Sequence, residues 1–202
     1  MSLNPEQLGI VNRAKNAVSP FDIGACLTDG FAALKRDFWN VVLVNLIGLF
    51  LCCFIVTLPP LIIGLVRFNA KAVAGQKGSF DDLFSGFAEF GTSWLMFIVM
   101  IVLLGVGFVL CYLPGIYLSI AWMFAWNLLA DKRGSFWECL EMSRQAVTAH
   151  WGWALLLLFV ASLLAYAGII ACIIGVFVTM PFYGLMLAAA YDRLFADQPP
   201  QL

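Results

Sequence analysis

Two basic residues lie close together within an apolar stretch, and they are the strongest candidates for chemistry in this chain of 202 residues. Arg67 follows Pro60 by seven residues, and Lys71 comes one helical turn later on the same face of a helix. A charge inside the hydrocarbon core of a membrane is costly, so it is usually paired, solvated or functional. This spacing predicts an intramembrane polar site at Arg67 and Lys71, with Asn45 as a polar neighbour. A shallow helical hairpin, from which Arg67 reaches water, is the alternative.

Residues for other kinds of chemistry are not gathered anywhere in the sequence. The chain has one histidine, His150, and its six cysteines contain no Cys-x-x-Cys pair, so we predict no metal site. The acids nearest to the predicted membrane crossings, Asp37, Asp131 and Asp192, lie at helix ends and none lies in the interior of a crossing, which argues against a proton-driven transporter. Because no nucleophile, base and metal ligands converge, we predict no enzyme activity, no catalytic residue and no cofactor.

Composition assigns the chain to a class. It is 63% hydrophobic and 11% charged, with a mean hydropathy of +0.95. Soluble domains carry about 25% charged residues, so the sequence predicts an all-α, polytopic membrane protein with a single membrane domain. The net charge of −1 argues against nucleic-acid binding.

Three long apolar runs are each interrupted by residues that favour a turn. The stretch 90–130 contains no charged residue and has Pro114 and Gly115 near its centre. At about 1.5 Å per residue, each half can cross a hydrocarbon core of about 30 Å. Pro59 with Pro60, and Gly175, are the corresponding hairpin turns in the other two runs. We therefore expect six transmembrane helices as three hairpins, over about 39–58, 60–76, 92–113, 114–131, 151–174 and 176–195.

A serine followed three residues later by an acid precedes each hairpin. Such a pair forms a reciprocal cap at a helix N-terminus. The three pairs are Ser19 with Asp22, Ser79 with Asp82, and Ser135 with Glu138. They predict cytoplasmic amphipathic helices over Pro20–Asp37, Phe80–Phe90 and Phe136–His150. In the second of these helices, the pattern predicts an apolar face opposite the acids Asp82 and Glu89. The residues of this apolar face are Leu83, Phe84, Phe87 and Phe90.

The caps and turns divide the chain into regions. The repeat units are about 19–76, 79–131 and 135–195, within one membrane domain over 19–195. Residues 1–18 are expected to form a cytoplasmic tail, and residues 196–202 a disordered one. All eleven Lys and Arg residues avoid the predicted outer turns, so both termini are expected in the cytoplasm.

Several stretches of the sequence resemble a known family. They are Gly64–Phe87, Leu113–Gly115, Glu138–Val147 and Met180–Leu194. Together they resemble an uncharacterised bacterial six-helix membrane family, the domain of unknown function 975 and its relatives, over about residues 20–195. The resemblance implies a multi-pass protein of the bacterial inner membrane, and it implies no activity or catalytic residue.

These observations favour a non-enzymatic scaffold that organises lipids or partner proteins from the cytoplasmic face. The alternative is a transporter or channel subunit with a path near Arg67. Small residues such as Gly184 and Ala188 allow helices to pack closely, either within the chain or against a second copy of it. The sequence is therefore compatible with both a monomer and a homo-oligomer.

Overall fold

The described part of the chain is helical throughout. The computed structural model describes residues 3–17, 22–51, 55–110, 112–170 and 173–195. These residues form helices joined by short connections and contain no strand, so the predicted all-α class is confirmed. In chain order the helices are α1 (Pro5–Lys15), α2 (Ile23–Arg36), α3 (Phe38–Leu51), η1 (Ile55–Thr57), α4 (Leu58–Val73), α5 (Phe80–Phe84), η2 (Ser85–Glu89), α6 (Phe90–Leu110), α7 (Tyr112–Ala121), α8 (Ala125–Ala130), α9 (Phe136–Ala149), α10 (Trp151–Ile170) and α11 (Ile173–Phe195).

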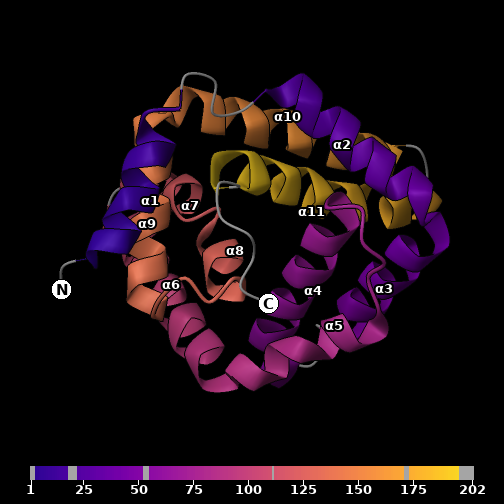
Figure 1. Cartoon of the computed structure of the whole chain (residues 1–202), viewed down its shortest axis with the longest axis horizontal. Coiled ribbons are helices and arrows are strands. Elements are labelled where there is room, and N and C mark those ends of the chain that lie inside the picture. Colours follow the sequence, from indigo (N-terminus) through magenta and orange to yellow (C-terminus); the bar gives the residue numbers. More distant parts are fainter. Residues whose placement is uncertain (1–2, 18–21, 52–54, 111, 171–172, 196–202) are drawn as a thin grey trace.

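Helix α11 has a central position, with α10, α2 and α4 packed against it (Figure 1). The larger core joins α11 to α8, α9 and α1 through fully buried side chains such as Phe124, Met142 and Met186. A second core joins α2, α3 and α4 around Leu61 and Phe68. The two cores fix α4 between α11 on one side and α5 with η2 on the other.

Two helical segments are long and apolar enough to cross a membrane. They are Phe80–Leu110, with 31 residues, and Tyr112–Ala130, with 19 residues. A third passes the same test only when Phe136–Ala149 and Trp151–Leu164 are joined across a bend of 99°. The described residues therefore hold two to three candidate spans, and the predicted six crossings are not confirmed.

The first predicted hairpin is shorter than the other two. Helix α3 has 14 residues and α4 has 16. At about 1.5 Å per residue they reach roughly 21 and 24 Å, which is less than a hydrocarbon core of about 30 Å. In contrast, α6, α10 and α11 have 21, 20 and 23 residues, and α7 together with α8 forms the segment Tyr112–Ala130 of 19 residues.

The predicted turn residues lie inside helices. Pro59 and Pro60 occupy the first turn of α4, where the missing proline N–H costs nothing. Pro114 and Gly115 lie in α7, which already begins at Tyr112. Gly175 lies in α11, which begins at Ile173. The expected turns at these residues are therefore corrected, because the structure places all of them within helices. Residues 52–54, 111 and 171–172, which precede these positions, lie outside the described residues.

The serine–acid pairs have different outcomes. The Ser79 amide donates to Asp82 Oδ2 at 2.8 Å, and the Ser135 amide donates to Glu138 Oε2 at 2.8 Å. Ser19 lies outside the described residues. Asp22 itself caps α2 by accepting from the Ala25 amide at 3.2 Å, so this helix begins at Ile23 rather than at Pro20.

The segment expected to be an N-terminal tail contains a packed helix. Helix α1 buries one face, including Ile10 and Val11, mainly against α9. Gln7 Nε2 donates to Glu138 Oε2 at 3.1 Å, and His150 Nε2 lies 2.9 Å from the Ala14 carbonyl oxygen. The polar face of α9 is therefore covered in part by the chain's own first helix. The expected tail at 196–202 lies outside the described residues.

Docking of α1 is expected to weaken in acid. The Ser135 amide, and then Gln7, hold the pKa of Glu138 below its ordinary value of 4.5. Because the folded pKa is lowered, the stabilisation is present above pH 4.5 and is lost as pH falls through the folded value. Hydrogen–deuterium exchange, corrected for its intrinsic pH dependence, should show lower protection of α1 at pH 3.5 than at pH 7. The Glu138→Gln variant should lack this pH dependence. Equal protection of α1 in the native chain at both pH values would contradict the prediction.

Candidate functional site

The candidate site is the contact between α4 and the segment formed by α5 and η2. Two glycines bring the backbones together there. A Cβ atom at Gly64 would overlap the Leu83 carbonyl oxygen, and one at Gly86 would overlap the Pro60 carbonyl oxygen. Only glycine permits this approach. The two segments run side by side in opposite directions, which places the side chains of the second half of α4 beside α5.

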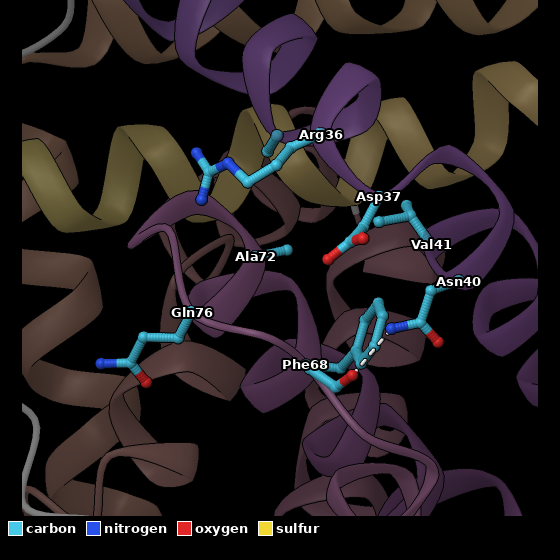
Figure 2. A pocket seen from close by; sticks show the side chains of 9 residues that line it. Arg36, Asp37, Asn40, Val41, Phe68, Ala72 and Gln76 are labelled. Carbon is cyan, nitrogen blue, oxygen red and sulfur yellow. Dashed lines mark hydrogen bonds between the residues drawn. The ribbon is translucent and has the colours of Figure 1, made fainter.

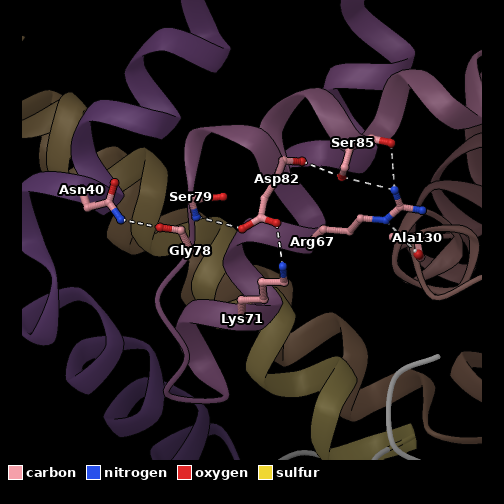
Figure 3. Close-up of polar contacts among 8 residues, drawn as sticks. All are labelled: Asn40, Arg67, Lys71, Gly78, Ser79, Asp82, Ser85 and Ala130. Carbon is pink, nitrogen blue, oxygen red and sulfur yellow. Dashed lines mark hydrogen bonds and ion pairs between the residues drawn. The ribbon is translucent and has the colours of Figure 1, made fainter. Parts of the chain in front are cut away.

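Lys71 and Asp82 form an ion pair in this contact. Lys71 Nζ lies 2.6 Å from Asp82 Oδ1, while Asp82 Oδ2 accepts from the Ser79 amide (Figure 3). Asp82 is buried, with 9% of its surface exposed. Both carboxylate oxygens are therefore engaged, one in holding α5 to α4 and the other in capping α5. An ion pair with little exposure is costly to break, because one charge would remain buried without a partner.

Arg67 connects three elements. Its Nε donates to the Ala130 carbonyl oxygen at 3.1 Å, and its Nη1 donates to Ser85 O and Oγ at 3.0 and 3.2 Å (Figure 3). Ala130 is the last residue of α8, whose final carbonyl groups lack partners within the helix. A positive charge at this end also complements the helix dipole. Arg67 is buried, and its Nη2 has no hydrogen-bond partner among the described residues.

Asn45, predicted as a neighbour of Arg67, is placed elsewhere. Its Nδ2 donates to the Val41 carbonyl oxygen at 2.9 Å and contacts Asn69 Oδ1 at 3.4 Å. The structure therefore brings Arg67 and Lys71 to the same segment, α5 with η2, and connects Asn45 to Asn69 instead. Asn69 also lies against Gly184 of α11, so this second polar contact joins α3, α4 and α11.

The α5–η2 segment turns Asp82 inward and its aromatic side chains outward. Asp82 and Leu83 face α4, whereas Phe84, Phe87 and Phe90 are 51%, 37% and 42% exposed. The sequence predicts Leu83 and the phenylalanines on one face opposite Asp82, and this prediction is wrong for the segment. Asp82 and Leu83 share the buried side because Lys71 and Gly64 receive them there. We call the set Phe80, Phe84, Phe87 and Phe90 the aromatic stripe.

A small cavity lies beside this contact, where α2 meets α3 (Figure 2). Its lining includes the polar residues Arg36, Asp37, Asn40 and Gln76, and Asn40 Nδ2 donates to the Gly78 carbonyl oxygen at 2.7 Å. Its volume of about 10 Å³ has room for about one water molecule. The cavity is therefore part of the packing around the Gly78 loop, and it is too small for a solute.

The geometry of the site indicates what it can do. The charged groups of Arg67, Lys71 and Asp82 already hold other parts of the chain together. Within the described ranges, no group of three His, Cys, Asp or Glu residues could hold a metal ion. The site therefore has the properties of a structural junction, in which one buried donor, Nη2 of Arg67, has no hydrogen-bond partner among the described residues.

Sequence reasoning misses three members of this junction, namely Ser85, Ala130 and Gly86. Ser85 follows Asp82 by three residues, so both project from one side of a helix, and this spacing was the available signal. Ala130 takes part through its backbone, which the sequence does not reveal.

No protein family, curated protein or solved structure matches this chain. Its class therefore follows from its own fold, which is an all-helical chain with two to three candidate membrane spans.

Proposed function

We propose that this chain is a non-enzymatic scaffold of the bacterial inner membrane that organises lipids and partner proteins from the cytoplasmic face. The aromatic stripe is the main support for this proposal. A segment that buries an ion pair and exposes phenylalanines is suited to a surrounding that is apolar. The stripe also continues into α6, a candidate span, through the aromatic contacts of Phe90 with Trp94 and of Trp94 with Phe97.

The length of the helical segment containing the stripe supports a position at the membrane boundary. Thirty-one residues span about 46 Å, which is roughly half again the thickness of a hydrocarbon core. The excess length belongs to the headgroup region, and α5 with η2 are the part that carries charged residues. Aromatic side chains are favoured at this depth because they are amphipathic or bury apolar surface beside the acyl chains.

The proposed topology has four crossings and one shallow hairpin. In this arrangement α6 with α7–α8 and α10 with α11 cross the membrane, and α3 with α4 enters from the cytoplasmic side and returns. The Trp94 Nε1 atom donates to the Val56 carbonyl oxygen at 3.1 Å, which supports a shallow first hairpin. From Trp94, α6 continues for 16 residues, or about 24 Å, to Leu110. Both termini remain in the cytoplasm, in agreement with the positions of the Lys and Arg residues.

The alternative is a transporter or channel subunit with a path near Arg67, and the buried Nη2 atom without a partner is the observation that favours it. Against this alternative, the other guanidinium nitrogens donate to Ala130 and Ser85, which leaves Arg67 little freedom to receive a solute.

Photo-crosslinking in native membranes tests the proposal. A benzophenone amino acid at position 84 is expected to form adducts with phospholipid, because this side chain lies in the stripe. The same probe at position 81 is the control, since Asp81 is exposed but outside the stripe. It should give adducts with water-soluble or partner proteins instead. The proposal fails if position 84 gives no lipid adduct, or if both positions give identical products.

A further inference from the structure

An open apolar groove lies between α2, α10 and α11. Its lining includes Phe31 and Ala32 of α2, Leu164 of α10 and Phe182 of α11. Its volume is about 540 Å³, within the range of roughly 300–1,000 Å³ typical of ligand sites. Phe31 leaves 54% of its surface exposed on one wall of this groove. The groove is therefore large enough, and apolar enough, to receive a hydrocarbon chain.

One cation lies at the edge of this groove. Lys35 is the only ionisable residue among the described lining residues, and its Nζ lies 5.4 Å from the centre of the Phe31 ring. Several cations of this chain are already paired with acids, namely Lys71, Lys132, Arg133, Arg144 and Arg193. Lys35 has no ion pair within the described part of the chain. Its charge is thus available to an anionic group at the end of a bound hydrocarbon chain.

We propose that this groove binds one anionic phospholipid of the inner leaflet, with an acyl chain along Phe31, Leu164 and Phe182 and the phosphate group at Lys35. The combination of an apolar wall and a single cation at its rim matches the two chemical parts of this lipid. Each methylene group of an acyl chain that is buried in the groove favours binding, and a basic residue near the anionic headgroup adds to this. The inference rests on the proposed membrane location, but it does not depend on the scaffold role or on the aromatic stripe.

Native mass spectrometry of the purified full chain tests this site with two lipids, phosphatidylglycerol and phosphatidylcholine. The native chain should retain the anionic lipid about fivefold more strongly, as expected for one basic residue near an anionic headgroup. Lys35→Ala should remove this preference and leave retention of phosphatidylcholine unchanged. Lys77→Ala is the matched control, because Lys77 is an exposed lysine outside the groove, and it should keep the preference.

A second variant tests the groove itself. Ala32→Trp fills the groove from the exposed face of α2 and should weaken retention of both lipids about tenfold, because several methylene groups lose their contacts. Its elution volume in size-exclusion chromatography must match that of the native chain. An unchanged preference in Lys35→Ala overturns the inference, as does unchanged retention in Ala32→Trp. A change of oligomeric state in Ala32→Trp also overturns it, and would assign the groove to a second copy of this chain.

The two proposals fail separately. Loss of lipid adducts at position 84, with groove binding intact, contradicts the scaffold proposal alone. Lipid adducts at position 84, without a headgroup preference that depends on Lys35, contradict the groove proposal alone.

Discussion

Gly64→Ala should lower the free energy of unfolding by about 3 kcal/mol, at the upper end of the cost of overpacking. The added Cβ would overlap the Leu83 carbonyl oxygen, a backbone atom that cannot turn aside as a side chain can. Helix α4 must therefore move away from α5, and this movement also strains the Lys71–Asp82 ion pair and the Arg67–Ser85 hydrogen bonds. Thermal unfolding in detergent, followed by size-exclusion chromatography, measures the loss.

Gly105→Ala is the matched control. Gly105 lies within α6, and a Cβ there would meet no atom within 4 Å. Because glycine weakens a helix interior by roughly 0.5–1 kcal/mol relative to alanine, this variant should be as stable as the native chain or more so. Gly86→Ala should behave like Gly64→Ala, since its Cβ would overlap the Pro60 carbonyl oxygen. Equal unfolding temperatures for Gly64→Ala and Gly105→Ala would contradict the close contact.

Arg67→Ala should also cost about 3 kcal/mol, because the carbonyl groups of Ala130 and Ser85 would lose their donor, at roughly 1–3 kcal/mol for each buried group left unsatisfied. For a chain of this size the unfolding temperature should fall by roughly 10 °C. Arg67→Lys should restore only part of the loss, since a single ammonium group cannot serve two elements as the planar guanidinium does.

Lys77→Ala, at an exposed lysine of the loop after α4, should change stability by less than about 0.5 kcal/mol. The same Arg67→Ala protein, reconstituted in vesicles, separates the two functional proposals. A stable variant that loses a selective solute flux present in the native protein would establish the transport alternative. A destabilised variant, with no such flux in either protein, agrees with Arg67 as a structural junction.

The sequence correctly predicts the helical class, because long apolar runs without charged residues are typical of helices that can cross a membrane. Its spacing also indicates that Arg67 and Lys71 share one face of α4, since one helical turn separates them. The partners of these two side chains could be predicted only in part from the sequence. Asp82 caps α5 and also pairs with Lys71, and only the first of these roles follows from local spacing.

The orientation of α5 could not be predicted from its pattern. In the membrane location that we propose for α5, the usual rule that apolar side chains face inward does not hold, because the surroundings can be as apolar as the core. Gly64 decides the orientation by admitting Leu83 to the inner side. The expected turns at the prolines are wrong for a different reason. Proline is compatible with the first turn of a helix, and Pro59 and Pro114 lie in the first turns of α4 and α7.

The contact between α1 and α9 affects how the chain must be made. Gln7 and its partner Glu138 are separated by 131 positions. At roughly 5–20 residues per second, α1 leaves the ribosome on the order of 10 s before α9 exists to receive it. During this time Ile10 and Val11, which end in the core, have no partner helix. Helix α1 therefore reaches its final position only after the helices between it and α9 have been synthesised.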